Sequence, residues 1–114
     1  MTQEKSKIKV VDVIGSSVAV STEKGETLFK KMSEDLEKGN HVTLSFEDVS
    51  HLVTAFVNAS IGQLYSKFPP DFIRDHMSVE DASEDAFYMI KRVTNNAKEY
   101  FANPLFEESQ LATV

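Results

Sequence analysis

Cysteine and tryptophan are absent from this chain of 114 residues, and glycine and proline are scarce, with four and three copies. Without cysteine the chain can form neither a disulfide nor a thiolate metal site nor a cysteine nucleophile, which fits a reducing compartment. It also lacks an apolar run near the roughly 20 residues of a membrane-spanning helix, and its polar first residues lack the apolar segment of a signal peptide. We therefore expect a soluble cytoplasmic protein that makes no membrane contact.

Positive charge is also in short supply. Twelve lysines and arginines stand against 18 aspartates and glutamates, which gives a net charge of −6. Proteins bind nucleic acid through clustered Lys and Arg side chains that displace counterions from phosphates, so we expect no nucleic-acid partner. The length is that of one domain. We place this domain at residues 7–103, between a disordered N-terminus of residues 1–6 and a C-terminal tail of residues 104–114.

Motifs that carry chemistry are missing as well. The three histidines, His41, His51 and His76, do not have the i+3 or i+4 spacing that would place two metal ligands on one face of a helix. The glycines fit neither a dinucleotide fingerprint nor a phosphate-binding loop, and no G-x-S-x-G nucleophile elbow is present. We therefore expect a protein that is not an enzyme and that needs no metal or cofactor.

Strand patterns occur in four places. Residues 8–14 are rich in β-branched side chains and end at a Gly-Ser-Ser turn, and residues 18–20 follow with the same composition, so these two runs predict a hairpin. Residues 41–46 alternate between apolar and polar side chains, which predicts a strand with one buried face. Residues 77–79 predict a further short strand.

Helical spacing of apolar residues predicts the remaining elements. One helix begins after Ser21 or Thr22, either of which can cap its first turn, and it ends at Gly39-Asn40. A short helix is expected over residues 71–76. The clearest pattern is an apolar stripe that ends before Pro69-Pro70, because proline cannot continue a helix; this stripe comprises Val57, Ile61, Leu64 and Phe68.

A last helix is predicted up to Asn103-Pro104. Asp81 is expected to cap it, with Glu84 at the third helical position of a capping box. Strands separated by helices predict an α/β fold with a small mixed, partly parallel sheet of about four strands. Because Thr43 and Ser45 make the second face of the central strand polar, we expect the helices mainly on one face.

The run VTLSFEDVSHLVTAFVNASIGQLY, residues 42–65, resembles the STAS-like domain family, whose relatives include the sulfate-transporter and anti-sigma-factor-antagonist domain. In that family a strand ends in a short acidic segment, and an apolar turn and a small hydroxyl residue then precede a helix. The order of the other elements agrees over about residues 7–103. The resemblance implies a non-catalytic regulatory module that docks on a signalling protein, either an anti-sigma factor or a histidine-kinase-like ATPase. A homo-oligomer is left open.

The resemblance also suggests the residues of a docking site. In antagonist domains a serine at the helix start is phosphorylated to break the complex, and Ala55 stands at that position here, where it cannot accept phosphate. Thr54 is therefore the candidate phosphoacceptor, although its hydroxyl could also cap the helix. Ser45 stands where such domains commonly have an aspartate. The partner-binding residues expected in the loop 47–54 and the following helix are Asp48, Ser50, His51, Thr54, Phe56 and Asn58.

An alternative from another class is a small-ligand or nucleotide-sensing α/β domain. Open α/β sheets bind ligands beyond the carboxyl ends of their strands. In this chain such a pocket would lie near Ser16, Ser17 and the turn of residues 47–54.

Overall fold

The computed structural model describes residues 5–102. Lys5 and Ser6 belong to the first strand, so the expected disordered N-terminus is wrong for these two residues, and the expected tail of residues 104–114 lies outside the described part of the chain. No helix of the described part is long and apolar enough to cross a membrane.

In chain order the elements are β1 (Lys5–Lys9), α1 (Val10–Ile14), β2 (Val18–Ala19), α2 (Thr22–Glu37), β3 (His41–Ser45), β4 (His51–Leu52), α3 (Thr54–Val57), the π-helix η1 (Asn58–Gly62), α4 (Gln63–Lys67), α5 (Pro70–His76), β5 (Met77–Glu80) and α6 (Glu84–Ala102).

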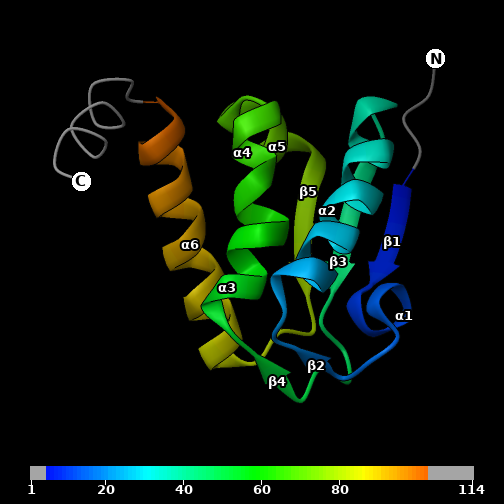
Figure 1. Cartoon of the computed structure of the whole chain (residues 1–114). Coiled ribbons are helices and arrows are strands. Elements are labelled where there is room, and N and C mark those ends of the chain that lie inside the picture. Colours follow the sequence, from blue (N-terminus) through cyan, green and yellow to red (C-terminus); the bar gives the residue numbers. More distant parts are fainter. Residues whose placement is uncertain (1–4, 103–114) are drawn as a thin grey trace, which may run out of the picture.

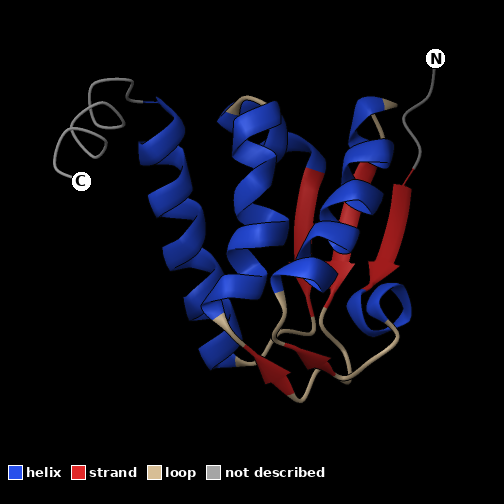
Figure 2. Cartoon of the chain, in the orientation of Figure 1, coloured by secondary structure: helices blue, strands red, loops and turns tan. Residues whose placement is uncertain are grey.

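The main sheet has three strands in the order β1-β3-β5, and both of its pairings are parallel. Leu44 at the centre of β3 pairs in register with Ile8 of β1 and with Val79 of β5. The helices α2, α3 with α4, and α6 lie on one face of this sheet (Figure 1, Figure 2). The expected α/β fold with helices mainly on one face is therefore confirmed.

The two faces of the sheet differ because successive side chains of a strand point in opposite directions. On the helix-covered face, Ile8, Val42 and Leu44 are almost fully buried. The opposite face carries polar side chains, among them Lys7 and Thr43. The polar positions of residues 41–46 thus mark the face that the helices leave open.

The predicted apolar helix before Pro69 is built from three consecutive segments, α3, η1 and α4. Its stripe residues Val57, Ile61 and Leu64 are buried as expected. Additional residues are buried because α2 lies on one side of this helix and α6 on the other (Figure 1). In the wider π-helical turn, Ser60 is fully buried and its Oγ donates a hydrogen bond of 2.8 Å to the carbonyl oxygen of Phe56.

Gly25 in the first turns of α2 marks a close approach between helices. A Cβ atom at this position would lie 2.8 Å from the Cβ of Ala59 and 2.9 Å from the carbonyl oxygen of Phe56. Only a residue without a side chain fits this contact. Gly25 is a poor helix former, but it lets α2 pack directly against α3 and η1.

The predicted N-terminal hairpin is wrong. Residues 10–14 form the helix α1, and β2 pairs in parallel with β4, with Val18 opposite His51. The helix places Val10 in the core at 0% exposure, and Gly15 ends it in the left-handed conformation at φ 68° while donating a 2.9 Å hydrogen bond to the Val11 carbonyl. Burial of one side of this short helix outweighs the strand preference of its β-branched residues, which depends on packing context.

The helix caps are partly as expected. Ser21 caps α2, since its side chain accepts a 3.1 Å hydrogen bond from the backbone N–H of Lys24. For α6 the predicted capping box is wrong, because the Oγ of Ser83, not Asp81, accepts a 3.1 Å bond from the N–H of Ala86. Asp81 instead adopts a left-handed backbone at φ 59°.

Candidate functional site

The loop between β3 and α3 crosses the carboxyl ends of the strands and includes β4 (Figure 1). Asp48 turns the loop with a left-handed φ of 67°, which aspartate tolerates better than most residues. The backbone N–H of Ser50 then donates a 2.8 Å hydrogen bond to the carbonyl oxygen of Ser17, and the two serine hydroxyls lie 3.2 Å apart. The loop is therefore joined to the segment around β2.

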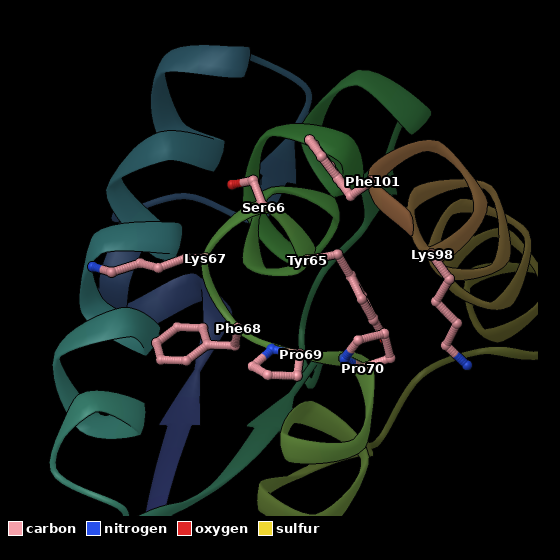
Figure 3. Close-up of a pocket in the computed structure, with 8 residues that line it drawn as sticks. All are labelled: Tyr65, Ser66, Lys67, Phe68, Pro69, Pro70, Lys98 and Phe101. Atoms are coloured by element: carbon pink, nitrogen blue, oxygen red, sulfur yellow. The ribbon is translucent and has the colours of Figure 1, made fainter. Parts of the chain in front are cut away.

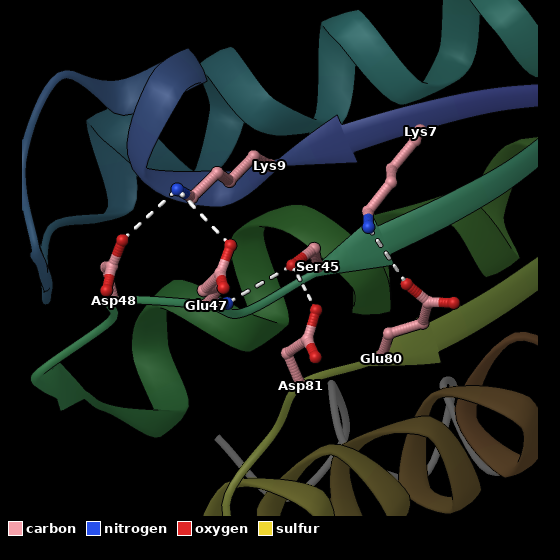
Figure 4. Close-up of polar contacts among 7 residues, drawn as sticks. All are labelled: Lys7, Lys9, Ser45, Glu47, Asp48, Glu80 and Asp81. Carbon is pink, nitrogen blue, oxygen red and sulfur yellow. Dashed lines mark hydrogen bonds and ion pairs between the residues drawn. The ribbon is translucent and has the colours of Figure 1, made fainter.

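Lys9 holds the loop from the end of β1. Its Nζ lies 3.1 Å from Oδ2 of Asp48 and 3.4 Å from Oε1 of Glu47 (Figure 4). The hydrogen bond to Asp48 is the main cause that raises the pKa of Lys9 above its ordinary value, against a smaller opposing effect of desolvation. Because both carboxylates are largely exposed, these contacts position the loop more than they stabilise the fold.

Ser45 connects this loop to the start of α6. The residue is fully buried, its Oγ donates a 2.8 Å hydrogen bond to Oδ2 of Asp81, and the same oxygen accepts a 3.2 Å bond from the N–H of Glu47 (Figure 4). Ser45 at the end of β3 therefore binds the carboxylate of Asp81 from across the sheet edge. Sequence reasoning missed this role of Asp81 because it assigned the residue to a helix cap.

Most of the expected docking residues lie at the surface of this loop and helix. Thr54 is partly exposed and opens α3 as its first helical residue, but the cap position belongs to Val53 and no side chain caps the helix, so the expected capping role of Thr54 is wrong. The exposed members of the set are Asp48, Ser50, His51 and Asn58.

Phe56 does not belong to this surface. Its side chain is 0% exposed, so it cannot contact a partner, and the prediction that it binds one is corrected. The residue points into the core because α3 has helices on both sides, as its packing against α2 and α6 indicates. The apolar stripe in the sequence predicts burial of only one side of this helix, and it therefore underestimates how much of the helix is buried.

Sequence reasoning missed an apolar patch beside the loop. Val18, Val20 and Val53 are exposed by 38%, 43% and 36%, and we call these three residues the valine patch. In β2 the small Ala19 between two valines points inward at 0% exposure, and the pairing of Val18 with His51 brings β4 alongside. The alternation Val-Ala-Val, with the small residue in the core, was the signal available in the sequence.

A cavity of about 370 Å³ lies between this loop and the first turns of α6. Its lining includes the carboxylates of Asp48, Asp81 and Asp85, together with apolar side chains such as Leu52 and Met89, and it contains no lysine or arginine. Within residues 5–102, no group of His, Asp or Glu side chains is arranged to hold a metal ion. This lining disfavours phosphate groups and favours positively charged ones.

The parallel sheet, the helices on one face and the loop surface at the strand ends define a small α/β domain of the STAS-like type. Residues 24–86 match the family described as a STAS-like domain of unknown function (DUF4325). This match covers more than half of the chain, and the chain belongs to that family. Searches of curated proteins and of solved structures found no match.

Proposed function

We propose that this chain is a non-catalytic regulatory module that docks on a protein partner through the loop 47–54, the first turn of α3 and the valine patch. The observation that carries the proposal is the valine patch itself, because three large apolar side chains are exposed together next to an ordered polar loop. Exposed apolar groups rimmed by polar residues are characteristic of protein interaction sites.

The chemistry of the surface narrows the kind of partner. Asp81 and Asp85 form no ion pair within the described residues, and they line the cavity beside the loop 47–54, so this side of the docking surface is negatively charged. A complementary partner presents apolar side chains surrounded by lysine or arginine, since opposite potentials speed association and exclude wrong partners. The resemblance to antagonist domains points to a histidine-kinase-like ATPase or an anti-sigma factor as the protein that carries such a surface.

Thr54 offers a way to regulate this docking. Its hydroxyl makes no side-chain hydrogen bond with another residue of the described part, and the side chain is partly exposed at the start of α3. Phosphorylation would add about 1.5 to 2 negative charges there. This charge would sit next to Val53 at the apolar centre of the interface, where binding would have to remove its water, so we expect it to weaken binding.

The test is the affinity of the full chain for purified histidine-kinase-like ATPases and anti-sigma factors of the same cell. We expect Val53→Asp to weaken binding by about tenfold or more, because it places a charge in the apolar centre of the interface. Thr54→Glu should act in the same direction. Tyr88→Asp on α6 is the matched control, at a residue that is 71% exposed and does not line the cavity beside the loop. Equal affinities for Val53→Asp and the control would refute the proposed surface.

The second candidate function is small-ligand sensing, which the cavity at the strand ends supports. The three carboxylates in its lining make a nucleotide a poor ligand and a small organic cation a better one. A ligand that binds only the folded chain raises its melting temperature as the ligand concentration increases. A thermal-shift series with diamines and with nucleotides therefore tests this candidate. No shift with either class would reject it.

A further inference from the structure

A groove runs along the outer edge of β5, where α5 and α6 form its walls. The cavity has a volume of about 450 Å³, and apolar side chains line much of it, including Ile73, Val79 and Ile90. Phe87 lies at the groove with 55% of its surface exposed. Within residues 5–102, β5 pairs only with β3, so its other edge leaves backbone N–H and C=O groups free to bind another extended segment.

The groove is positively charged in a chain with a net charge of −6. Its lining contains Arg74, Lys91 and Lys98 and no aspartate or glutamate. Lys91 and Lys98 form no ion pair with another residue of the described range, whereas Arg74 contacts Asp71 and Asp75 on its own helix. A segment that combines apolar and acidic side chains therefore complements the groove.

The chain itself contains such a segment directly after α6. Residues 105–111 read LFEESQL, with two adjacent glutamates, Glu107 and Glu108, among leucine and phenylalanine side chains. We propose that residues 105–111 bind in this groove of their own chain, beside the free edge of β5, with one of the two adjacent glutamates facing Lys91 or Lys98.

The length of the segment suits the groove. Phe87 and Lys98 mark the two ends of the groove along α6 and are about 17 Å apart, from roughly 1.5 Å per helical residue. Seven extended residues span about 23 Å, from roughly 3.3 Å per residue. A smaller cavity near the end of α6, lined by Tyr65, Lys98 and Phe101 among others, shares Tyr65 and Lys98 with the groove (Figure 3). The two cavities therefore adjoin at Tyr65 and Lys98, between the end of α6 and β5.

The topology also favours this placement. The strands β1, β3 and β5 follow one another across the sheet in one direction, and the helices that connect them lie on the same face (Figure 1). Parallel strands need a long crossover such as a helix. A segment that returned from the end of α6 along the free edge of β5 would be parallel to β5 and would continue the strand order β1-β3-β5. The crossover through α6 would then have the same handedness as the two earlier crossovers.

An engineered disulfide tests the proposal cleanly because the chain has no cysteine. Thr94 lies on the groove wall, so the pair Thr94→Cys and Ser109→Cys should oxidise within one chain. The matched control pairs Ser109→Cys with Lys30→Cys, an exposed position on α2 away from the groove. We expect the groove pair to close about tenfold faster or more, because docking raises the effective concentration of the two thiols.

Charge reversal supplies the second arm of this experiment. Glu107→Lys with Glu108→Lys should slow the groove pair to the rate of the control pair. Equal rates for the groove and control pairs without charge reversal would overturn the proposal. Disulfide-linked dimers in place of intramolecular closure would also overturn it, since they would assign the groove to a second copy of the chain.

Hydrogen exchange provides a readout that needs no cysteine. In the natural chain we expect the backbone amides of β5 to exchange several-fold more slowly than in the variant with both glutamates reversed. The amides of the central strand β3 serve as the internal control, because they report on global stability. Unchanged exchange at β5 would contradict the proposal.

Discussion

At the scale of single residues, Gly25 shows how strongly one contact constrains the packing of the helices. Helix propensity alone predicts that Gly25→Ala stabilises α2 by up to about 1 kcal/mol. The contact with Ala59 and with the Phe56 carbonyl predicts the opposite, a loss of about 1–3 kcal/mol, because an added methyl group would force the helices apart. Urea unfolding measures the difference.

The control for this prediction is the double variant Gly25→Ala with Ala59→Gly. It removes the closest of the two clashes, at 2.8 Å, and leaves the contact with the Phe56 carbonyl. We expect partial recovery of the stability lost in Gly25→Ala. A Gly25→Ala variant that is more stable than the natural chain would contradict the close packing of α2 against η1.

Tyr65 should make the free energy of unfolding depend on pH in the alkaline range. Burial raises the pKa of its hydroxyl above the ordinary value of 10.0, so the folded chain favours the neutral phenol. The stabilising contribution is fully present below about pH 10, the unfolded pKa, and is lost as pH rises through the folded pKa. We expect unfolding free energy to fall less between pH 9 and 11 in Tyr65→Phe than in the natural chain. Parallel curves for the two proteins would refute this.

At the scale of elements, the start of α6 distinguishes the predicted helix cap, Asp81, from the observed cap, Ser83. Ser83→Ala should lower the unfolding free energy by about 1 kcal/mol, because it removes the acceptor for the free N–H of Ala86. Ser83→Asp should retain most of the stability, since a carboxylate can cap the same N–H. Urea unfolding of both variants tests this assignment. An unchanged stability in Ser83→Ala would show that the cap contributes nothing.

Elements with a strong local signal could be predicted from the sequence. Each of these signals involves only neighbouring residues: the cap Ser21, the alternation over residues 41–46 and the proline after α4. They predict α2, β3 and the end of α4. The helix α1 and the pairing of β2 with β4 depend on contacts between distant parts of the chain. No local pattern reports which strand β2 will meet, so a hairpin was the natural but wrong prediction.

In the candidate site, too, some features could be predicted from local sequence and others depend on contacts between distant parts of the chain. The polar loop residues Asp48, Ser50 and His51 are exposed as their composition suggests. The burial of Phe56 could not be foreseen, because it requires knowing that helices flank α3 on both sides. The exposure of Val18 and Val20 was missed because valines in a short strand usually point to a core, although the alternation with the small Ala19 indicated the opposite.

At the scale of the whole molecule, the fold separates its surfaces by chemistry. The open face of the sheet is polar and carries paired charges such as Lys7 with Glu80, at 3.3 Å. The carboxyl ends of the strands present the valine patch and an acidic cavity, and the edge of β5 presents a cationic groove. Two surfaces of opposite charge on one small domain allow one to bind a partner while the other binds a segment of the chain itself.

The proposal that the loop 47–54 and the valine patch form the docking surface is tested most directly by mapping the interface. Backbone amide resonances of the isotope-labelled full chain are followed while a purified histidine-kinase-like ATPase or anti-sigma factor that binds it is added. We predict that the largest changes fall on residues 18–20 and 48–55, and that the open face of β1 and β3 changes little. Changes centred on another face, with residues 18–20 and 48–55 unaffected, would contradict the account.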